Sequence, residues 1–262
     1  MFQTFRRLVV SNASWAAVLG VISMCGMDFP LVVAQEFRVE TEVFVGDAAE
    51  PTGRATTLYE KSAVYHFVDS PAEIVVYRRG VNGSAGQFIL LDLARQVRTE
   101  IPLDRMEKLV EKLTEWSAGQ DAELPKFAAR PEFKQSIDDK TGTLTLANDL
   151  WTYRVATVAA EEPACLLRFR EFTDAYARLN CVVHHGLPPG PRLALNSVLA
   201  ERGLAPIEIQ REVSGQKESA RSVQFFSWRL SREDRDRLDD AREKIASFKK
   251  VSNEAFQQKA AE

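Results

Sequence analysis

Apolar and polar residues alternate through much of the first half of the chain, and this pattern predicts β-strands. In FRVETEVFVG, apolar positions recur at nearly every second residue from Phe37 to Val45, which is the period of a strand with one side in water. TTLYEKSAVYHFV at residues 56–68 continues the alternation, and EIVVYRR, QFILLDL and RQVRTEI follow at short intervals. Five strands with such spacing predict an antiparallel meander.

After these strands the apolar period lengthens to three or four residues, which predicts a helix. Pro102 suits a first helical position, because its fixed φ and missing donor do no harm there. LDRMEKLVEKLTEWSAG carries one apolar stripe and ends at Gly119, so this helix should lie against the sheet. Residues 119–131 are rich in proline, alanine and charge, and we expect a loop there.

The second half of the chain returns to strands and then to paired helices. FKQSID, GTLTLAN and WTYRVATV read as strands, and CLLRFREFTDAYARLNCVV reads as an amphipathic helix of about five turns. A second helix, RLALNSVLAERG, precedes the strands PIEIQREV and ARSVQFFSWRL. Ser231 and Asp234 form a capping box that begins a last helix. This order predicts an α+β fold, an antiparallel sheet of about 10 strands covered on one face by amphipathic helices.

The amino terminus has the layout of a secretory signal. Arg6 and Arg7 precede a mainly apolar run, and Val32 and Ala34 suit the pocket of a signal peptidase. We therefore expect a signal peptide at residues 1–34, cleaved after Ala34. The mature chain, residues 35–262, is expected to be one α+β domain that is periplasmic or secreted.

Two other readings of this terminus remain open. A retained membrane anchor is one, although Asp28 and Pro30 interrupt the apolar run short of the roughly 20 residues of a spanning helix. A lipoprotein anchored at Cys25 is the other, although the bulky Met24 precedes that cysteine. No later apolar segment approaches membrane length, so no stable span is expected after cleavage.

The charge of the chain argues against a nucleic-acid partner. The full sequence has 34 basic and 37 acidic residues, a net charge of −3. Removal of Arg6, Arg7 and Asp28 leaves 34 − 2 = 32 basic and 37 − 1 = 36 acidic residues, a net charge of −4 with interspersed signs. A nucleic-acid binder would need a basic stripe.

The stretch CVVHHGLPPGP raises the question of a metal site, because Cys181, His184 and His185 lie at i, i+3 and i+4 on a helix. A fourth ligand is missing nearby, and Gly186 follows at once. We interpret the histidines as the polar end of a helix, where a cation complements the backbone dipole, and expect no metal. We also expect Cys165 and Cys181 to be buried free thiols, because sixteen helical steps would hold them about 24 Å apart.

No motif for a catalytic nucleophile, a nucleotide loop or a zinc hydrolase occurs in the sequence. His66 lies inside an alternating strand and faces opposite to its neighbours, which favours a strand histidine with a satisfied hydrogen bond over a catalytic base. Asp69, Asp92 and Asp149 lie at strand ends, where turns also place such residues. We therefore expect no catalytic residue and no cofactor, with a secreted metal-dependent hydrolase as the least favoured alternative.

The order of elements resembles the LolA-like group of periplasmic lipoprotein carriers and their LppX-like relatives. The resemblance lies in the opening strand FRVETEVFVG, in the pair QFILLDL and RQVRTEI ahead of a helix, and in LAPIEIQREV followed by ARSVQFFSWRL. It implies a curved half-barrel whose helices cover an apolar cavity that accepts acyl chains. The paired helices at about residues 164–203 look like an insertion into that plan.

This resemblance implies a non-enzymatic protein that binds an apolar ligand between its sheet and its helices. The expected partner is a lipid or a lipoprotein, with envelope proteins as further candidates. The residues expected to line the cavity are Val39, Val43, Phe88, Leu90, Tyr153 and Phe225. The alternative is that the helices fill the trough with ordinary core, and the protein then serves as a structural or protein-interaction module of the cell envelope.

Overall fold

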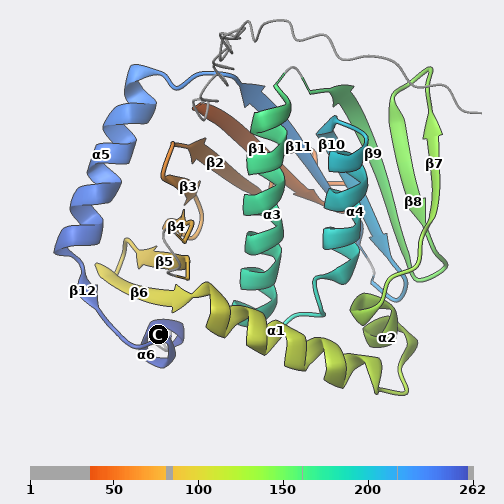
Figure 1. Ribbon diagram of the computed structural model, residues 1–262, viewed down its shortest axis with the longest axis horizontal. Coiled ribbons are helices and arrows are strands. Elements are labelled where there is room, and N and C mark those ends of the chain that lie inside the picture. Colours follow the sequence, from red (N-terminus) through yellow and green to blue (C-terminus); the bar gives the residue numbers. More distant parts are fainter. Residues whose placement is uncertain (1–35, 81–84, 161, 217, 259–262) are drawn as a thin grey trace, which may run out of the picture. The chain divides into compact units, whose positions relative to one another are not determined.

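The computed structural model of the protein describes residues 36–80, 85–160, 162–216 and 218–258. Within these residues the chain is α+β: it forms 12 strands and six helices (Figure 1). The strands are β1 (Phe37–Val45), β2 (Gly53–Tyr59), β3 (Ala63–Val68), β4 (Glu73–Arg78), β5 (Gln87–Asp92), β6 (Val97–Pro102), β7 (Lys134–Asp138), β8 (Thr143–Ala147), β9 (Trp151–Ala159), β10 (Leu204–Val213), β11 (Ala220–Ser227) and β12 (Lys249–Lys250). The helices are α1 (Leu103–Ala118), α2 (Glu123–Ala129), α3 (Pro163–Val183), α4 (Gly190–Glu201), α5 (Arg232–Ser247) and α6 (Asn253–Gln257).

All of these strands belong to one open sheet, in the order β12-β6-β5-β4-β3-β2-β1-β11-β10-β9-β8-β7. The first six strands form the predicted meander, and β1 pairs with β11 to join it to the second half of the sheet. Neighbours are antiparallel except β12 and β6, which are parallel, so the sheet is mixed rather than wholly antiparallel.

The expected count of about 10 strands was wrong for two local reasons. Residues 56–68 form two strands, because Glu60 and Ala63 close a tight hairpin in which the Glu60 amide donates to the Ala63 carbonyl at 3.0 Å. After α5 the chain adds β12 along β6, where the Lys249 amide donates to the Gln96 carbonyl at 3.2 Å. This addition covers part of an edge that would otherwise expose unpaired backbone groups.

Helices pack against both faces of the sheet, which corrects the expectation that they cover one face. On β4, Val75 and Tyr77 belong to the core shared with α3, whereas Ile74 and Val76 belong to a second core beneath α5. The physical cause is the strand period of two, which sends neighbouring side chains to opposite faces. The central meander strands are therefore buried on both sides, and α5 lies across the sheet from α3 (Figure 1).

The paired helices α3 and α4 supply much of the core on the other face. Leu166, Phe169 and Leu179 of α3 pack with residues of β1, β2, β4 and β5, while Leu195 and Leu199 of α4 pack with β8, β9 and β10. The segment that resembled an insertion is thus a main packing layer of the fold.

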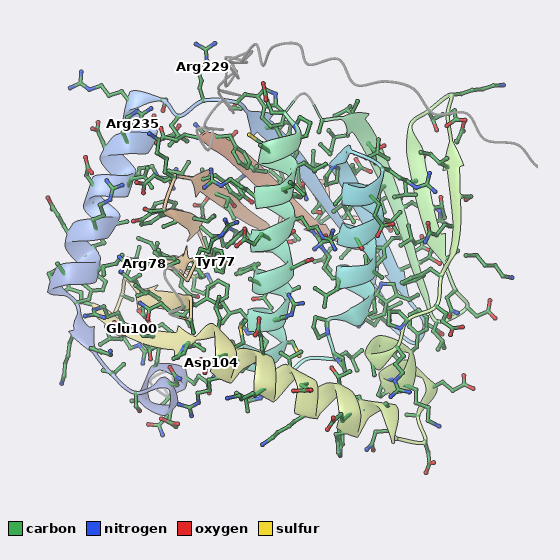
Figure 2. The ribbon with its side chains drawn as sticks, viewed as in Figure 1. Tyr77, Arg78, Glu100, Asp104, Arg229 and Arg235 are labelled. Carbon is green, nitrogen blue, oxygen red and sulfur yellow. The ribbon has the colours of Figure 1, made fainter. Side chains whose placement is uncertain are left out.

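Polar contacts fix α3 over the meander. Tyr77, labelled in Figure 2, reaches from β4 to α3, where its hydroxyl donates to Glu171 Oε1 at 2.8 Å. Arg79 Nε donates to the same carboxylate oxygen at 2.7 Å.

The predicted capping box at the start of α5 is confirmed. Asp234 N donates to Ser231 Oγ at 3.0 Å, and Ser231 N donates to Asp234 Oδ2 at 2.8 Å.

The predicted loop at residues 119–131 was wrong in part, since it contains α2, whose Phe127 and Ala128 are buried. The predicted signal peptide at residues 1–34 lies outside the described residues and stays a prediction.

Candidate functional site

A cavity of about 650 Å³ lies between the sheet and the pair α3 and α4. Its floor comes from β1, β2, β3, β9, β10 and β11, and its roof from α3, from the connection to α4 and from the first residues of α4. Small-ligand sites in proteins have volumes of about 300–1,000 Å³. The helices therefore leave space above this part of the sheet that is large enough for a ligand.

The residues that line the cavity are buried at one end and exposed to solvent at the other. Val39, Tyr59 and Phe172 are buried and form the deep end, where Phe37 stacks on Tyr59 at 3.9 Å between ring centres. His184 and Gln216 line the cavity but are exposed to solvent. The opening thus lies where the end of α3 meets the turn between β10 and β11.

The structure brings three of the six expected site residues to this cavity. Val39 and Val43 on β1 and Tyr153 on β9 line it. Alternation along the strands places them there, because Val39 and Val43 share one face of β1.

The other three expected residues lie elsewhere. Phe88 and Leu90 are buried in the core between β5 and α3, away from the cavity lining. Phe225 is 51% exposed, and its neighbours Gln224 and Phe226 face the cavity and the α3 core. Since successive strand residues face opposite sides, Phe225 points to the other face of the sheet. The sequence did not indicate which side Phe225 faces, because β11 carries apolar residues on both of its faces.

His66 is a buried, neutral residue of the cavity wall. Its Nδ1 lies 2.9 Å from Thr57 Oγ1, and its ring packs 4.7 Å from the ring of Tyr176. Burial lowers the pKa of His66 to about 4, and burial raises the pKa of Tyr176 to about 12. The interpretation of His66 as a strand histidine with a satisfied hydrogen bond is therefore confirmed.

The cavity also contains arginines that the sequence reasoning missed. Arg192 at the start of α4 and Arg211 on β10 line it and are half-buried. Arg211 lies over the ring of Trp151, with Cζ 5.8 Å from the ring centre. Burial lowers the pKa of Arg192. The alternation of β10 offered a signal for Arg211, because it falls between the inward-facing Ile209 and Val213.

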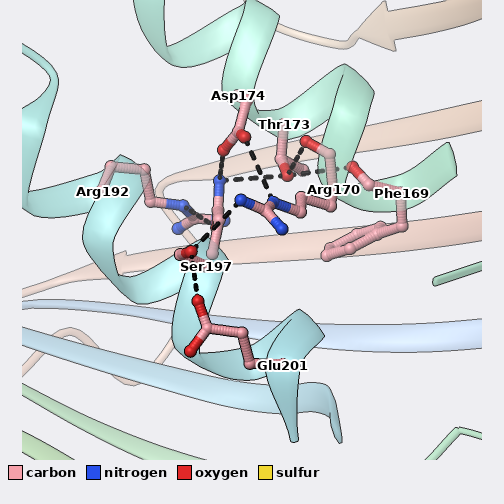
Figure 3. Close-up of polar contacts among 8 residues, drawn as sticks. Phe169, Arg170, Thr173, Asp174, Arg192, Ser197 and Glu201 are labelled. Carbon is pink, nitrogen blue, oxygen red and sulfur yellow. Dashed lines mark hydrogen bonds and ion pairs between the residues drawn. The ribbon is translucent and has the colours of Figure 1, made fainter. Parts of the chain in front are cut away.

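A polar network joins α3 to α4 beside this site (Figure 3). Asn196 Nδ2 donates to Asp174 Oδ1 at 2.7 Å, and Asn196 Oδ1 accepts a hydrogen bond from Arg192 Nε at 3.0 Å. The Nε of Arg170 lies 3.5 Å from the second oxygen of Asp174. Asn196 is 3% exposed, so this network fixes the Arg192 side chain from within the helix pair.

The group Cys181, His184 and His185 forms the joint between α3 and α4. Cys181 is buried, and its Sγ lies 4.0 Å from the Gly186 carbonyl oxygen. Both histidines are exposed at the helix end, and the described residues contain no cluster of His, Cys, Asp and Glu suited to a metal ion. Cys165 and Cys181 are free thiols, as expected, and burial raises the pKa of each. They therefore stay protonated and poorly nucleophilic at neutral pH.

No protein-family model matches the chain, and a search of curated proteins finds no significant match. None of the helices in the described part of the chain combines the length and the apolar character that a membrane span requires. The cavity and the side chains that line it are therefore the features of this protein that bear on its function.

Proposed function

We propose that this protein is a non-enzymatic, periplasmic or secreted protein that binds an apolar ligand in the cavity beneath α3 and α4. The ligand class is a lipid or the lipid group of a lipoprotein, as in the LolA-like carriers that the chain resembles. In this proposal the open sheet curves around α3 as a half-barrel. The observation that carries the proposal is the cavity of about 650 Å³, which is lined largely by aliphatic and aromatic side chains.

The energetics of such binding need no catalytic group. Each buried methylene contributes roughly 0.8 kcal/mol, so a sixteen-carbon chain gains on the order of 10 kcal/mol gross. Val39, Tyr59, Phe169 and Phe172 offer an apolar surface at the deep end for that chain. Ordering the ligand and the protein then reduces the net affinity.

Native mass spectrometry of the purified protein tests this proposal. We expect a ligand mass that organic extraction removes, and binding of the neutral apolar probe N-phenyl-1-naphthylamine by the extracted protein. Ala177→Phe on α3 should fill the cavity and lower probe binding, because Ala177 lines it. Leu167→Phe is the matched control, since Leu167 of the same helix is 64% exposed. A folded protein that carries no ligand and binds no probe would refute the proposal.

A protein-interaction module of the cell envelope is the second candidate, and α1 provides the observation in its favour. Leu109 and Trp116 are 44% and 60% exposed and lie seven residues apart, which places them on one side of the helix. Exposed apolar residues that share a surface are typical of interaction sites. An empty cavity, together with concentration-dependent association that Trp116→Ser abolishes, would favour this candidate over the first.

A further inference from the structure

The charges inside the ligand cavity have one sign. Arg192, Arg211 and Arg221 line it, and among the described lining residues there is no aspartate or glutamate. Arg221 already has partners, since it lies 3.5 Å from Glu208 and stacks at 3.9 Å on the ring of Phe44. The other two arginines come from opposite walls of the cavity, Arg192 from α4 and Arg211 from β10.

Neither of these two guanidinium groups has a carboxylate bound to it. The Nε of Arg211 is buried and has no hydrogen-bond partner. The described contacts of Arg192 consist of one hydrogen bond, from Nε to Asn196, and they leave both Nη atoms without a protein acceptor. A buried polar group left unpaired costs about 1–3 kcal/mol, and more when it is charged.

A neutral polar group in the same cavity is also unpaired. Gln224 on β11 is 7% exposed and lines the cavity, and its Oε1 has no hydrogen-bond partner. Native proteins leave few buried polar atoms in this state, and a water molecule or a bound ligand can supply the missing partner. The unpaired Nε of Arg211, the Nη atoms of Arg192 and the unpaired amide oxygen of Gln224 therefore offer hydrogen-bond donors and one acceptor to the polar end of a ligand.

We propose that the ligand is an amphiphile with an oxyanion head, a carboxylate or a phosphate on a long alkyl chain, whose oxygens bind Arg192 and Arg211. This inference rests on the proposed function, because it specifies the polar end of the same apolar ligand. The planar guanidinium group donates two parallel hydrogen bonds to a carboxylate or a phosphate. The alkyl chain then lies along the deep aromatic end of the cavity.

A head-group series measured on the extracted protein tests this inference. Palmitate, hexadecyl phosphate and hexadecanol share one chain length and differ at the head, and calorimetry below their micelle concentrations gives the affinity of each. We expect at least one of the two anions to bind at least about 10-fold more tightly than the alcohol, since charge-assisted hydrogen bonds contribute about 1.5–3 kcal/mol. The comparison of palmitate with hexadecyl phosphate distinguishes a fatty acid from a phosphate ligand.

Substitution of the arginines provides the second readout. Arg192→Met and Arg211→Met should each weaken binding of the anion by about 10- to 100-fold and leave hexadecanol binding unchanged. Arg154→Met is the matched control, because Arg154 is an exposed arginine of β9 that pairs with Glu212 at 2.5 Å outside the cavity. Arg211→Lys keeps the positive charge but loses the planar guanidinium group that donates two parallel hydrogen bonds. It should therefore weaken anion binding less than Arg211→Met.

The possible results separate this inference from the proposed function. Equal affinities for the alcohol and both anions would overturn the oxyanion head and leave the apolar cavity site intact. Failure of all three amphiphiles to bind the folded wild-type protein would overturn both. Should a methionine variant not fold, the head-group series on the wild-type protein still decides, because it needs no substitution.

Discussion

Acidification should destabilise the fold through one buried histidine. His66 is 9% exposed, and burial lowers its pKa from 6.5 to about 4. In the unfolded chain this residue takes up a proton near pH 6.5, whereas in the folded chain it does so only near pH 4. The unfolded state therefore binds more protons between these values, and stability falls as the pH falls through this window. Above about pH 8 His66 is neutral in both states, and the residue adds no pH dependence.

The size of the effect follows from the two pKa values. At pH 5 the histidine is almost fully protonated in the unfolded chain and about 10% protonated in the folded chain, which corresponds to a loss of about 2 kcal/mol. Well below pH 4 the loss reaches its limit of about 3 kcal/mol. Carboxylates act at lower pH: the hydrogen bond from Lys250, for example, holds the pKa of Glu100 below its ordinary value.

Urea unfolding at pH 7.5, 6 and 5 measures this loss. We expect the free energy of unfolding of the wild-type protein to fall by about 2 kcal/mol more than that of His66→Gln, which cannot titrate. His184→Gln should behave like the wild-type protein, because His184 is exposed at the end of α3. If His66→Gln lost as much stability as the wild-type protein between pH 7.5 and 5, the assignment of the effect to His66 would be refuted.

Three further substitutions test the packing around the site by thermal and urea unfolding. Asn196→Ala should cost about 1–3 kcal/mol, because it removes the buried donor to Asp174; a loss below 0.5 kcal/mol, on the order of an exposed substitution, would contradict this. Ser231→Ala should cost about 1 kcal/mol through the lost cap of α5, and an unchanged midpoint would count against the capping box. Gly190→Ala should destabilise the start of α4, because its Cβ would lie 2.3 Å from the Ala128 carbonyl oxygen; wild-type stability would show that α2 can move away.

Periodicity along the chain predicted most elements of the fold but not which faces they bury. The strands of the meander, the long helices and the capped α5 all follow from the spacing of their apolar residues. The position of α5 on the second face was not predicted, although the four consecutive apolar residues of QFILLDL, Phe88 to Leu91, contain the signal. A strand with one face in solvent would alternate apolar and polar residues, whereas an unbroken apolar run is typical of a strand buried on both faces.

Other elements depend on contacts that a local pattern does not contain. The hairpin at Glu60 to Ala63 lacks glycine and proline, so nothing marks it against the alternation on either side. Helix α2 is only seven residues long, and helices of this length are marginal without tertiary packing. Phe127 supplies that packing, because it is buried in the core that α4 shares with β8, β9 and β10.

The cavity was predictable in its apolar part and not in its charged part. Val39, Val43 and Tyr153 follow from strand alternation, which points them to the side where α3 and α4 lie. Arg192 and Arg211 were missed because arginine occurs at exposed positions in most strands and helices. The position of Arg211 becomes informative only when its neighbours Ile209 and Val213 are known to face inward.

The network between α3 and α4 connects the packing of the fold to the charge of the cavity. Asp174 already accepts a hydrogen bond from the Asn196 amide and lies beside Arg170, so this carboxylate is occupied within the helix pair. Asn196 in turn holds Arg192 by its Nε, which leaves the outer nitrogens of that guanidinium for a ligand. A ligand bound to Arg192 therefore favours the same pairing of α3 with α4 that the network favours, and it should raise the stability of the protein in proportion to the logarithm of its concentration. Asn196→Ala should then weaken the binding of an anionic amphiphile as well as the fold, because the lost contact releases the cation that the head group needs.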